Sequence, residues 1–392
     1  MAYQSLPSPL RRAEAFAYRS PHSQPPRSRG HCNDMNSATL VPATDFRWRG
    51  FLDGKPHDPY QLPEYAAVAA LSECGAAAAF YAEEREQEGV LMPLLLRELP
   101  PELGAPASWR DAISPYGYAG PITTTGFPLD RLRRTLHLLA DVAREHDIVS
   151  AFVRLNPLRA IPTTAFDQLG TVVNHGQVVY IDLSKTPDEF WAETRVSHRQ
   201  DIVRLKRLGY TVHMDDWGDY PEFQAMYEMT MQRRSASAFY YFSDQYFTGL
   251  RDRLGDKLHL CTVRGPDGDI AAGGLFLVAG GIAEYHLSGT ADAHRNKAPS
   301  KLMLDFARGW AKELGLSFMN LGGGFGGKAG SLHDFKRGFS PLQADFHTVR
   351  IVFDQRRYDE LTRARDQLHP DETAEDAFFP SYRRPHPSPQ EG

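Results

Sequence analysis

Segments typical of helices and of strands alternate along this chain, and the alternation occurs twice in the same order. In the first half we expect a helix from Leu62, strands over 77–82 and 89–97, an amphipathic helix over 128–146 and a strand over 151–155. In the second half we expect strands over 178–183, 257–264, 270–278, 282–288 and 317–321, and helices over 187–208, 220–235 and 299–314. Such alternation is typical of mixed sheets covered by helices. The predicted fold class is therefore α/β, with two similar domains in tandem.

The predicted domains occupy residues 45–178 and 179–360, between two tails. Residues 1–44 are rich in Ser, Pro and Arg and lack an apolar period of 2 or 3.6, which is typical of disorder. Residues 361–392 are expected to be loose as well, since Pro385, Pro387 and Pro389 fall within the last eight residues.

The net charge of -5 at pH 7 is unevenly distributed. Five arginines and two acids give the first 44 residues a charge of +3, so the remainder carries -8. Such an acidic chain is not expected to bind nucleic acid indiscriminately, but a local basic groove remains compatible with it. No run of eighteen apolar residues occurs and the three cysteines lie far apart, so we expect no membrane span, no disulfide framework and a cytoplasmic location.

Several common catalytic motifs are missing. The sequence contains no HExxH, no GxSxG and no Cys/His set at metal-binding spacing, which argues against the usual zinc hydrolases and serine hydrolases. We therefore expect neither a metal nor a resident cofactor.

The densest candidate site is the segment LGGGFGGKAGSLHDFKRGFSP at 321–341, where six glycines follow a predicted strand. Glycine lets a backbone approach a ligand closely, so Gly323 and Gly324 are candidate substrate-binding residues. The GxxxxGK spacing of a P-loop is present, but Ala329 occupies the position of the magnesium-binding hydroxyl, which argues against a nucleotide site. A flexible surface loop is the simpler alternative.

The residues after these glycines combine cations with aromatic rings. Lys336 and Arg337 lie between Phe335 and Phe339, a combination that suits an anionic backbone and flat groups. Lys336 is the favoured site residue, whereas a solvated charge is the simpler interpretation of Arg337. Asp334 adjoins the Phe-Lys pair as a candidate catalytic carboxylate, against the default of an exposed side chain.

A second basic group lies on the predicted helix over 187–208. Arg195, Arg199 and Lys206 fall near one face of that helix, which is either a binding surface for an anionic partner or an ordinary solvated face. Arg233 and Arg234 end the following helix, where they either bind substrate or only complement the helix dipole.

A pair of tyrosines marks the loop SPYGYAGP at 114–121. Tyr116 and Tyr118 flank Gly117, and Gly120 with Pro121 forms a stiff turn. The two phenols either project from the loop toward a substrate or pack the turn itself.

In their order and spacing, these motifs resemble the Fem-like branch of the GNAT superfamily. The resemblance covers roughly residues 45–355 and is carried by SPYGYAGP, SHRQDIVRLKRLGYTV, TMQRR followed by aromatics, YHLSGTADAHRNKAPSKLMLDFARGWAKELG and NLGGGFGGKAGSLHDFKRGFSP. Members of that branch have two GNAT-like domains and transfer an aminoacyl group from aminoacyl-tRNA to an amine. The resemblance implies aminoacyl-tRNA as co-substrate and an amine-bearing small molecule or peptide as acceptor, in peptidoglycan or natural-product synthesis.

The resemblance also implies roles for single residues. Phe335 and Lys336 match the Phe-Lys pair of the branch, whose lysine contacts phosphate or the reacting carbonyl region. Arg233 matches an arginine of the branch, and Gly120 ends the loop whose aromatics, here Tyr116 and Tyr118, face the acceptor. Ala119 stands where peptidoglycan-type members often carry arginine, and no coiled-coil arm is inserted, which puts a cell-wall acceptor in doubt.

Two alternatives remain at this point. An acyl-CoA-dependent GNAT enzyme binds pyrophosphate on a glycine-containing turn at the start of a helix. The corresponding residues 295–300 lack both glycines, and Pro299 removes one N–H donor. The other alternative is a non-catalytic module that binds RNA or a partner through the basic helix.

Overall fold

The computed structural model describes residues 37–85, 88–159, 161–234, 236–324, 330–370 and 378–385. Residues 1–36 of the predicted N-terminal tail, residues 371–377 and 386–392 of the predicted C-terminal tail, and residues 325–329 of the glycine-rich segment lie outside this description. From Asn36 onward the chain forms one compact unit. No helix in the described ranges is long and apolar enough to cross a membrane.

One sheet of thirteen strands runs through this unit. The strands of the first half are β1 (Ser37–Pro42), β2 (Gly75–Arg85), β3 (Glu88–Glu98), β4 (Arg110–Ile113), β5 (Ile122–Thr123) and β6 (Ile148–Arg154). Those of the second half are β8 (Thr211–Met214), β9 (Leu258–Arg264), β10 (Ile270–Ala279), β11 (Ile282–Thr290) and β12 (Phe318–Gly322). Between the two sets lie β7 (Thr171–Asp182) and β13 (Gln343–Val352), in the order β1-β2-β3-β4-β6-β13-β7-β12-β11-β10-β9-β8, with β5 paired to β3.

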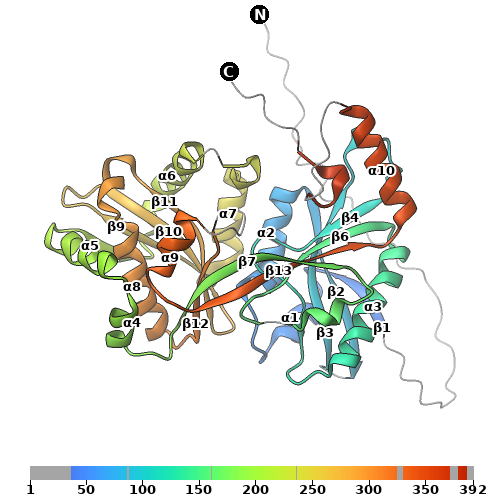
Figure 1. Cartoon of the computed structure of the whole chain (residues 1–392), viewed down its shortest axis with the longest axis horizontal. Coiled ribbons are helices and arrows are strands. Elements are labelled where there is room, and N and C mark those ends of the chain that lie inside the picture. The colour runs from blue at the N-terminus through green and yellow to red at the C-terminus, as the bar shows by residue number, and fades with distance from the viewer. Residues whose placement is uncertain are drawn as a thin grey trace, which may run out of the picture. The chain divides into compact units, whose positions relative to one another are not determined.

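Strands β7 and β13 join the two halves of the sheet. β13 comes late in the chain, yet its residues 348–352 pair with β6 in the first half. β7 pairs with β13 along most of its length and with β12 through residues 179–182. Figure 1 shows both strands passing between the two halves. Backbone hydrogen bonds, and not only side chains, therefore hold the halves together.

Helices cover both parts of the sheet. Those of the first half are α1 (Phe46–Leu52), α2 (Pro63–Glu73), α3 (Leu129–Glu145) and α10 (Gln355–Leu368). Those of the second half are α4 (Pro187–Glu193), α5 (Val196–Arg207), α6 (Tyr220–Arg233), α7 (Asp244–Leu254), α8 (Ser300–Glu313) and α9 (Ser331–Arg337). The amphipathic helix α3 buries Leu132, Leu136 and Leu139 in the core of the first half, as its period of 3.6 predicts.

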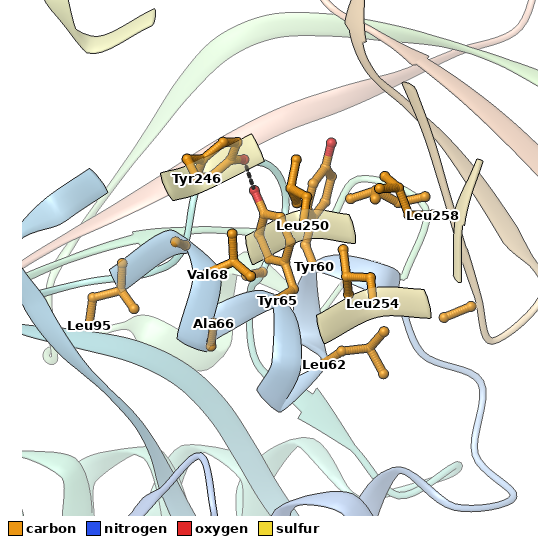
Figure 2. Packing of buried hydrophobic residues seen from close by; sticks show 14 of the residues in the cluster. Tyr60, Leu62, Tyr65, Ala66, Val68, Leu95, Tyr246, Leu250, Leu254 and Leu258 are labelled. Atoms are coloured by element: carbon orange, nitrogen blue, oxygen red, sulfur yellow. Dashed lines mark hydrogen bonds between the residues drawn. The ribbon is translucent and has the colours of Figure 1, made fainter. Parts of the chain in front are cut away.

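A hydrophobic cluster continues from the first half into the second. Helix α2 packs against α7, and Tyr65 and Tyr246 bring their hydroxyl oxygens to 3.5 Å from each other (Figure 2). Leu250 and Leu254 of α7 are buried in the same cluster. Burial of this apolar area stabilises the pairing of the halves that β7 and β13 establish.

The α/β fold class is confirmed by this architecture, and each strand and helix expected from the sequence corresponds to an element. The helix expected over 187–208 is divided into α4 and α5, because Thr194 leaves the helical conformation (φ -69°, ψ 128°). The predicted tail from residue 361 contains the end of α10, and Tyr382 is buried with its hydroxyl 2.7 Å from Ser150 Oγ. Strand β1 starts within the predicted N-terminal tail because it pairs with β2, and the expected domain border at 178/179 falls inside β7.

The turn between β10 and β11 provides a test of the contact between the halves. Gly280 has φ +52°, and a Cβ placed on it would overlap the His57 carbonyl oxygen. We expect Gly280→Ala to lower the free energy of unfolding by about 2–4 kcal/mol, because both the positive φ and the overlap oppose a methyl group. The measurement is equilibrium unfolding in urea.

Gly268→Ala is the matched control for this variant. Gly268 has φ +88° but open space around it, so only the backbone cost of about 1 kcal/mol is expected. Equal losses in the two variants would contradict a close contact between Gly280 and His57.

Candidate active site

A cavity of about 1480 Å³ lies between the first-half and second-half parts of the sheet. Strands β6 and β13 and the loop at 116–118 line one side, and β11, α6 and α9 line the other. Single ligand pockets usually measure about 300–1,000 Å³, so the cavity has room for more than one substrate. Among the described residues that line it, ten are arginine or lysine and two are glutamate. The cavity therefore favours anionic ligands.

Lys336 lies at the centre of the lining. It belongs to α9, which follows the glycine-rich segment, and its Nζ donates a hydrogen bond of 2.7 Å to the Gly323 carbonyl oxygen. Gly322 has φ +76°, and a Cβ there would lie 3.2 Å from both Lys336 Nζ and the Tyr118 hydroxyl. The glycine at 322 therefore lets both side chains approach its backbone closely. Burial lowers the pKa of Lys336 to about 7.

Phe335 fixes the helix that carries Lys336. Its ring contacts His198 of α5 and Phe339, with centroids 5.4 Å and 5.6 Å away. A Cβ on Gly338 would overlap the His198 ring, so α9 and α5 approach closely. The Gly338 carbonyl oxygen also accepts a 2.8 Å hydrogen bond from the Arg195 N–H. The aromatic member of the Phe-Lys pair positions the lysine.

A pair of buried carboxyl groups lies behind Lys336. Asp58, at the start of the 3₁₀ helix Pro59–Gln61, and Glu284 of β11 hydrogen bond to each other. Asn320 Nδ2 donates 3.0 Å to Glu284, and Asn156 Nδ2 donates 2.8 Å to Asp58. Burial, and next the charge of Asp58, raise the pKa of Glu284 well above its ordinary value. Two buried carboxyl groups that hydrogen bond to each other share a proton, and the pair connects the two halves.

His286 of β11 is buried among tyrosines. Its Nδ1 lies 3.0 Å from the Tyr60 hydroxyl and its Nε2 lies 2.9 Å from the Tyr246 hydroxyl. Burial lowers the pKa of His286 to about 3, so the ring is neutral, with one nitrogen donating and the other accepting. This histidine organises the wall of the cavity rather than exchanging protons at neutral pH.

The two loop tyrosines predicted from the sequence both line the cavity. Tyr118 packs against Phe346 with ring centroids 5.2 Å apart, and Tyr116 packs against Phe239 at 5.4 Å. Gly120 does not line the cavity. Its carbonyl oxygen accepts a 2.8 Å hydrogen bond from Gln61 Nε2, and a Cβ on it would lie 2.9 Å from the Arg154 carbonyl oxygen.

The other predicted residues divide between the cavity and the surface. Arg233, Arg234, Gly323 and Gly324 line the cavity, and Arg233 forms an ion pair with Asp292. Asp334 and Arg337 are exposed and are not part of the lining, because they point from α9 away from Lys336. A role for Asp334 at the reacting atoms is therefore not supported by its position.

The three cations predicted on the basic helix do not share one surface. Arg199 lines a shallow groove of about 590 Å³ on α5, together with Arg204, Arg207 and the exposed Val196 and Val203. Lys206 lies outside this groove, and its Nζ is 3.4 Å from Asp305 of α8. Arg195 precedes α5 and is exposed.

Sequence reasoning missed the buried polar residues. The side chains of β11 alternate along the strand: Ile282, Glu284, His286 and Ser288 on one face, and Ala283, Tyr285 and Leu287 between them in sequence. Such alternation is typical of a strand with one face in solvent. Here the polar face is buried against the first half. Arg154 was missed as well, because a single arginine at the end of a strand carries no signal in the sequence. Within the described ranges, no group of three or more His, Cys, Asp or Glu residues is arranged to hold a metal.

The proton on Glu284 leads to a prediction about stability. Because its pKa is raised in the folded state, the folded protein binds more protons than the unfolded chain above about pH 4.5. The contribution of Glu284 to stability is therefore complete below that pH and is lost as the pH rises toward the folded-state pKa. Glu284→Gln keeps the shape of the neutral acid. Its free energy of unfolding is expected to exceed that of the wild type, by a difference that grows from pH 5 to pH 8.

The measurement is urea denaturation across that pH range, with Glu284→Ala as control. Glu284→Ala should be destabilised by about 2 kcal/mol or more at every pH, since it leaves Asn320 without its acceptor. A difference between Glu284→Gln and wild type that does not change with pH would contradict a proton on Glu284.

Comparisons with known proteins concern the fold of the chain. Residues 192–337 match the family model described as acetyltransferase (GNAT) domain. FemX is 14% identical with a TM-score of 0.62, over 82% of this chain and 98% of FemX. L-PGS from Bacillus licheniformis is 13% identical with a TM-score of 0.52, over 83% of this chain and 97% of that chain. A conserved protein of unknown function from Bacteroides thetaiotaomicron is 11% identical with a TM-score of 0.52, over 81% of this chain and 100% of its own.

No curated protein sequence matches this chain. At identities this low, the likeness to the solved structures concerns the fold. Residues 192–337 match the GNAT acetyltransferase model, and the chain shares its fold with FemX and L-PGS, as the sequence motifs predict.

Proposed function

We propose that this protein transfers an aminoacyl group from aminoacyl-tRNA to the amine of a small-molecule or peptide acceptor. In this reaction the amine nitrogen attacks the ester carbonyl carbon, a C–N bond forms, and the C–O bond to the ribose breaks. The ribose oxygen leaves with the proton that the amine loses. Because the ester is already activated, the enzyme needs chiefly to align the two reactants and to stabilise the developing oxyanion.

The observation that carries the proposal is the buried Lys336 ammonium in the wall of a cationic cavity. Its Nζ now donates to the Gly323 carbonyl oxygen at 2.7 Å. A donor ester carbonyl in that position would receive the same hydrogen bond, and its oxyanion would receive a stronger one in this dry environment. The Tyr118 hydroxyl beside Gly322 supplies a second donor.

The turn before α8 favours tRNA over acyl-CoA as donor. In GNAT enzymes that use acyl-CoA, free backbone N–H groups at this turn hold the pyrophosphate. Here the N–H groups of Ala298, Lys301 and Leu302 donate to carbonyl oxygens within the turn at 3.0–3.2 Å, and Pro299 has none. Arg233, Arg234 and Arg295, which line the second-half end of the cavity, would instead bind phosphates through their side chains.

The groove on α5 gives the body of a tRNA a place to bind. Arg199 and Arg207 lie in it beside exposed apolar residues, and cations of this kind contact phosphates without reading sequence. Arg195 is exposed next to them. Lys206 is a weaker candidate, because Asp305 already pairs with it.

The proton released by the amine has no protein acceptor in this proposal. Glu284 is protonated, and Asp334 is exposed away from the cavity. Transfer to the departing ribose oxygen, directly or through water, requires no base on the enzyme.

Replacing Lys336 tests its role. The ammonium form acts in the proposal, and with its pKa near 7 the lysine loses its charge above that pH, so activity should fall on the alkaline side. We expect Lys336→Met to lower kcat by about 10²-fold or more. Lys336→Arg should retain part of the activity and move the alkaline limb to higher pH, because arginine stays charged. The measurement is the pH profile of kcat.

Arg337→Gln is the matched control, since Arg337 is adjacent in sequence but exposed and outside the cavity. Its kcat should stay within about twofold of the wild type. An alkaline limb that remains at the same pH in Lys336→Arg would remove Lys336 from the reaction.

The donor is tested with purified protein and charged tRNA. Amide formation on a panel of amines is expected with a mixture of aminoacyl-tRNAs and should stop after ribonuclease treatment. Steep loss of activity with added salt is also expected, because phosphate contacts release counterions. Turnover with acyl-CoA after ribonuclease treatment would refute the proposed donor.

A further inference from the structure

Two buried asparagines lie on opposite sides of the acid pair formed by Asp58 and Glu284. Asn156 follows β6 in the first half, and Asn320 belongs to β12 in the second. Asn156 Nδ2 donates 2.8 Å to Asp58 Oδ2. Asn320 Nδ2 donates 3.0 Å to Glu284 Oε1, and the two carboxyl groups hydrogen bond to each other. A continuous series of hydrogen bonds therefore runs from one half of the molecule to the other.

In the first half, Asn156 connects the acid pair to the loop that carries Tyr118. Its Oδ1 accepts hydrogen bonds from the N–H groups of Leu158 and Arg159 at 2.9 Å and 2.8 Å. These two bonds fix the orientation of the amide, because only the oxygen can accept them. The amide nitrogen then faces Asp58 and also the Tyr118 carbonyl oxygen, which lies 3.2 Å away.

The same loop is held a second time through Asp58. Gln61 Oε1 accepts a 2.9 Å hydrogen bond from the Asp58 N–H, and Gln61 Nε2 donates 2.8 Å to the Gly120 carbonyl oxygen. The carbonyl groups of Tyr118 and Gly120 are thus both tied to Asp58, one through Asn156 and one through Gln61.

In the second half, Asn320 connects the acid pair to the turn that receives Lys336. The pairing of β12 with β7 changes register between Asn320 and Gly322, and the Gly322 N–H donates 2.9 Å to Asn320 Oδ1. The positive φ of Gly322 lets Lys336 and Tyr118 approach its backbone, and Lys336 Nζ donates to the next carbonyl oxygen along the chain. Asn320 therefore holds the turn against which the ammonium lies.

The members of this bridge lie behind the wall of the cavity. All four are less than 5% exposed and none of them lines it: Asp58, Asn156, Glu284 and Asn320. They can act on a substrate only through other residues. The two ends of the bridge are Tyr118 and Lys336, the groups that would donate to the carbonyl oxygen of the donor. A fully bonded polar network favours one arrangement of its members, which suits the alignment of two such donors.

We propose that Asn156 and Asn320 are positioning residues, which act through the acid pair to hold Tyr118 of the first half against Lys336 of the second. What Tyr118 and Lys336 do in the reaction rests on the proposed function, whereas the bridge between them does not. Without either asparagine, the loop and the turn would move independently of each other. A misplacement of about 1 Å can lower a rate by about 10²-fold.

The first measurement follows the protonation of Lys336 in the full chain, through its labelling by acetic anhydride at a series of pH values and mass spectrometry. The wild-type midpoint is expected at about pH 7. Asn320→Ala and Asn156→Ala should each raise the midpoint by about one pH unit or more, because a loosened turn lets water reach the ammonium. Asn156 belongs to the opposite half, so its effect has to pass through the acid pair. The double variant should therefore shift about as far as one single variant.

Asn174→Ala is the matched control. Asn174 Oδ1 accepts a 2.7 Å hydrogen bond from the N–H of Gly176, two residues further on, and Gly176 has φ +101°. This is the local arrangement of Asn320 with Gly322, without the link to the acid pair. Asn174 is exposed and does not line the cavity. The Lys336 midpoint in Asn174→Ala should equal that of the wild type.

The kinetics of transfer give the second measurement. Asn156→Ala and Asn320→Ala should lower kcat by about tenfold or more and leave the KM for aminoacyl-tRNA within about twofold, because the cations that would bind its phosphates are unchanged. Melting curves verify that each variant folds. Where an alanine variant does not fold, the serine variant replaces it, since a hydroxyl bonds part of the buried partners but cannot span both.

The outcomes separate the bridge from the proposed function. A Lys336 midpoint that stays at the wild-type pH in Asn156→Ala, or that rises equally in Asn174→Ala, overturns the bridge. A higher KM with an unchanged kcat overturns it as well. A shift confined to the variants of Asn156 and Asn320 supports the bridge even if no transfer from tRNA is found, and in that case only the proposed function fails.

Discussion

The rest of the structure depends on β7 and β13, which pair with each other and join the two halves of the sheet. β13 is inserted between β6 and β7, so the halves cannot separate without breaking backbone hydrogen bonds on both sides of it. Unpaired backbone groups in a sheet are costly, which makes a rigid junction the stable solution. The α2–α7 packing then buries apolar area on top of this junction.

The junction explains why polar groups are buried at the centre of the molecule. It holds the polar face of β11 against the 3₁₀ helix Pro59–Gln61, so Glu284 meets Asp58 and His286 meets Tyr60. Each buried group has a partner, and the two carboxyl groups share a proton because two charges there would be too costly. The same rigidity favours the proposed reaction, because an amine and an ester stay aligned when the walls of the cavity do not move.

The sequence predicts local structure well here because the local signals are strong. The apolar period of α3 and the turn after β9 depend only on neighbours in the chain, and their elements lie within a residue or two of the expected ranges. The glycines before Lys336 also carry a clear signal, and Gly322 has the positive φ and close approach that glycine permits. The pairing of β13 with β6 has no such signal, because its partner lies nearly two hundred residues away.

The same limit applies to the candidate site. Lys336, Tyr116 and Tyr118 were predicted because motifs surround them, whereas Glu284 gains its role only from Asp58 in the opposite half of the molecule. Asp334 was predicted from adjacency to Lys336, but residues two apart on a helix point about 200° apart, so adjacency in sequence placed it outside the cavity.

The charge of the cavity lining differs from that of the chain as a whole. The chain is acidic overall, yet the described lining carries ten arginines and lysines against two glutamates. Arg233 is paired with Asp292. In the proposed reaction, a donor phosphate would displace this ion pair, which would keep the affinity for the donor moderate. At the first-half end, Arg154 packs against the Phe152 ring, and its Nη1 donates 2.8 Å to the Ser114 carbonyl oxygen. In the proposed transfer, the donor ester and the acceptor amine would meet at Lys336 and Tyr118, whose positions limit the direction from which the amine can attack.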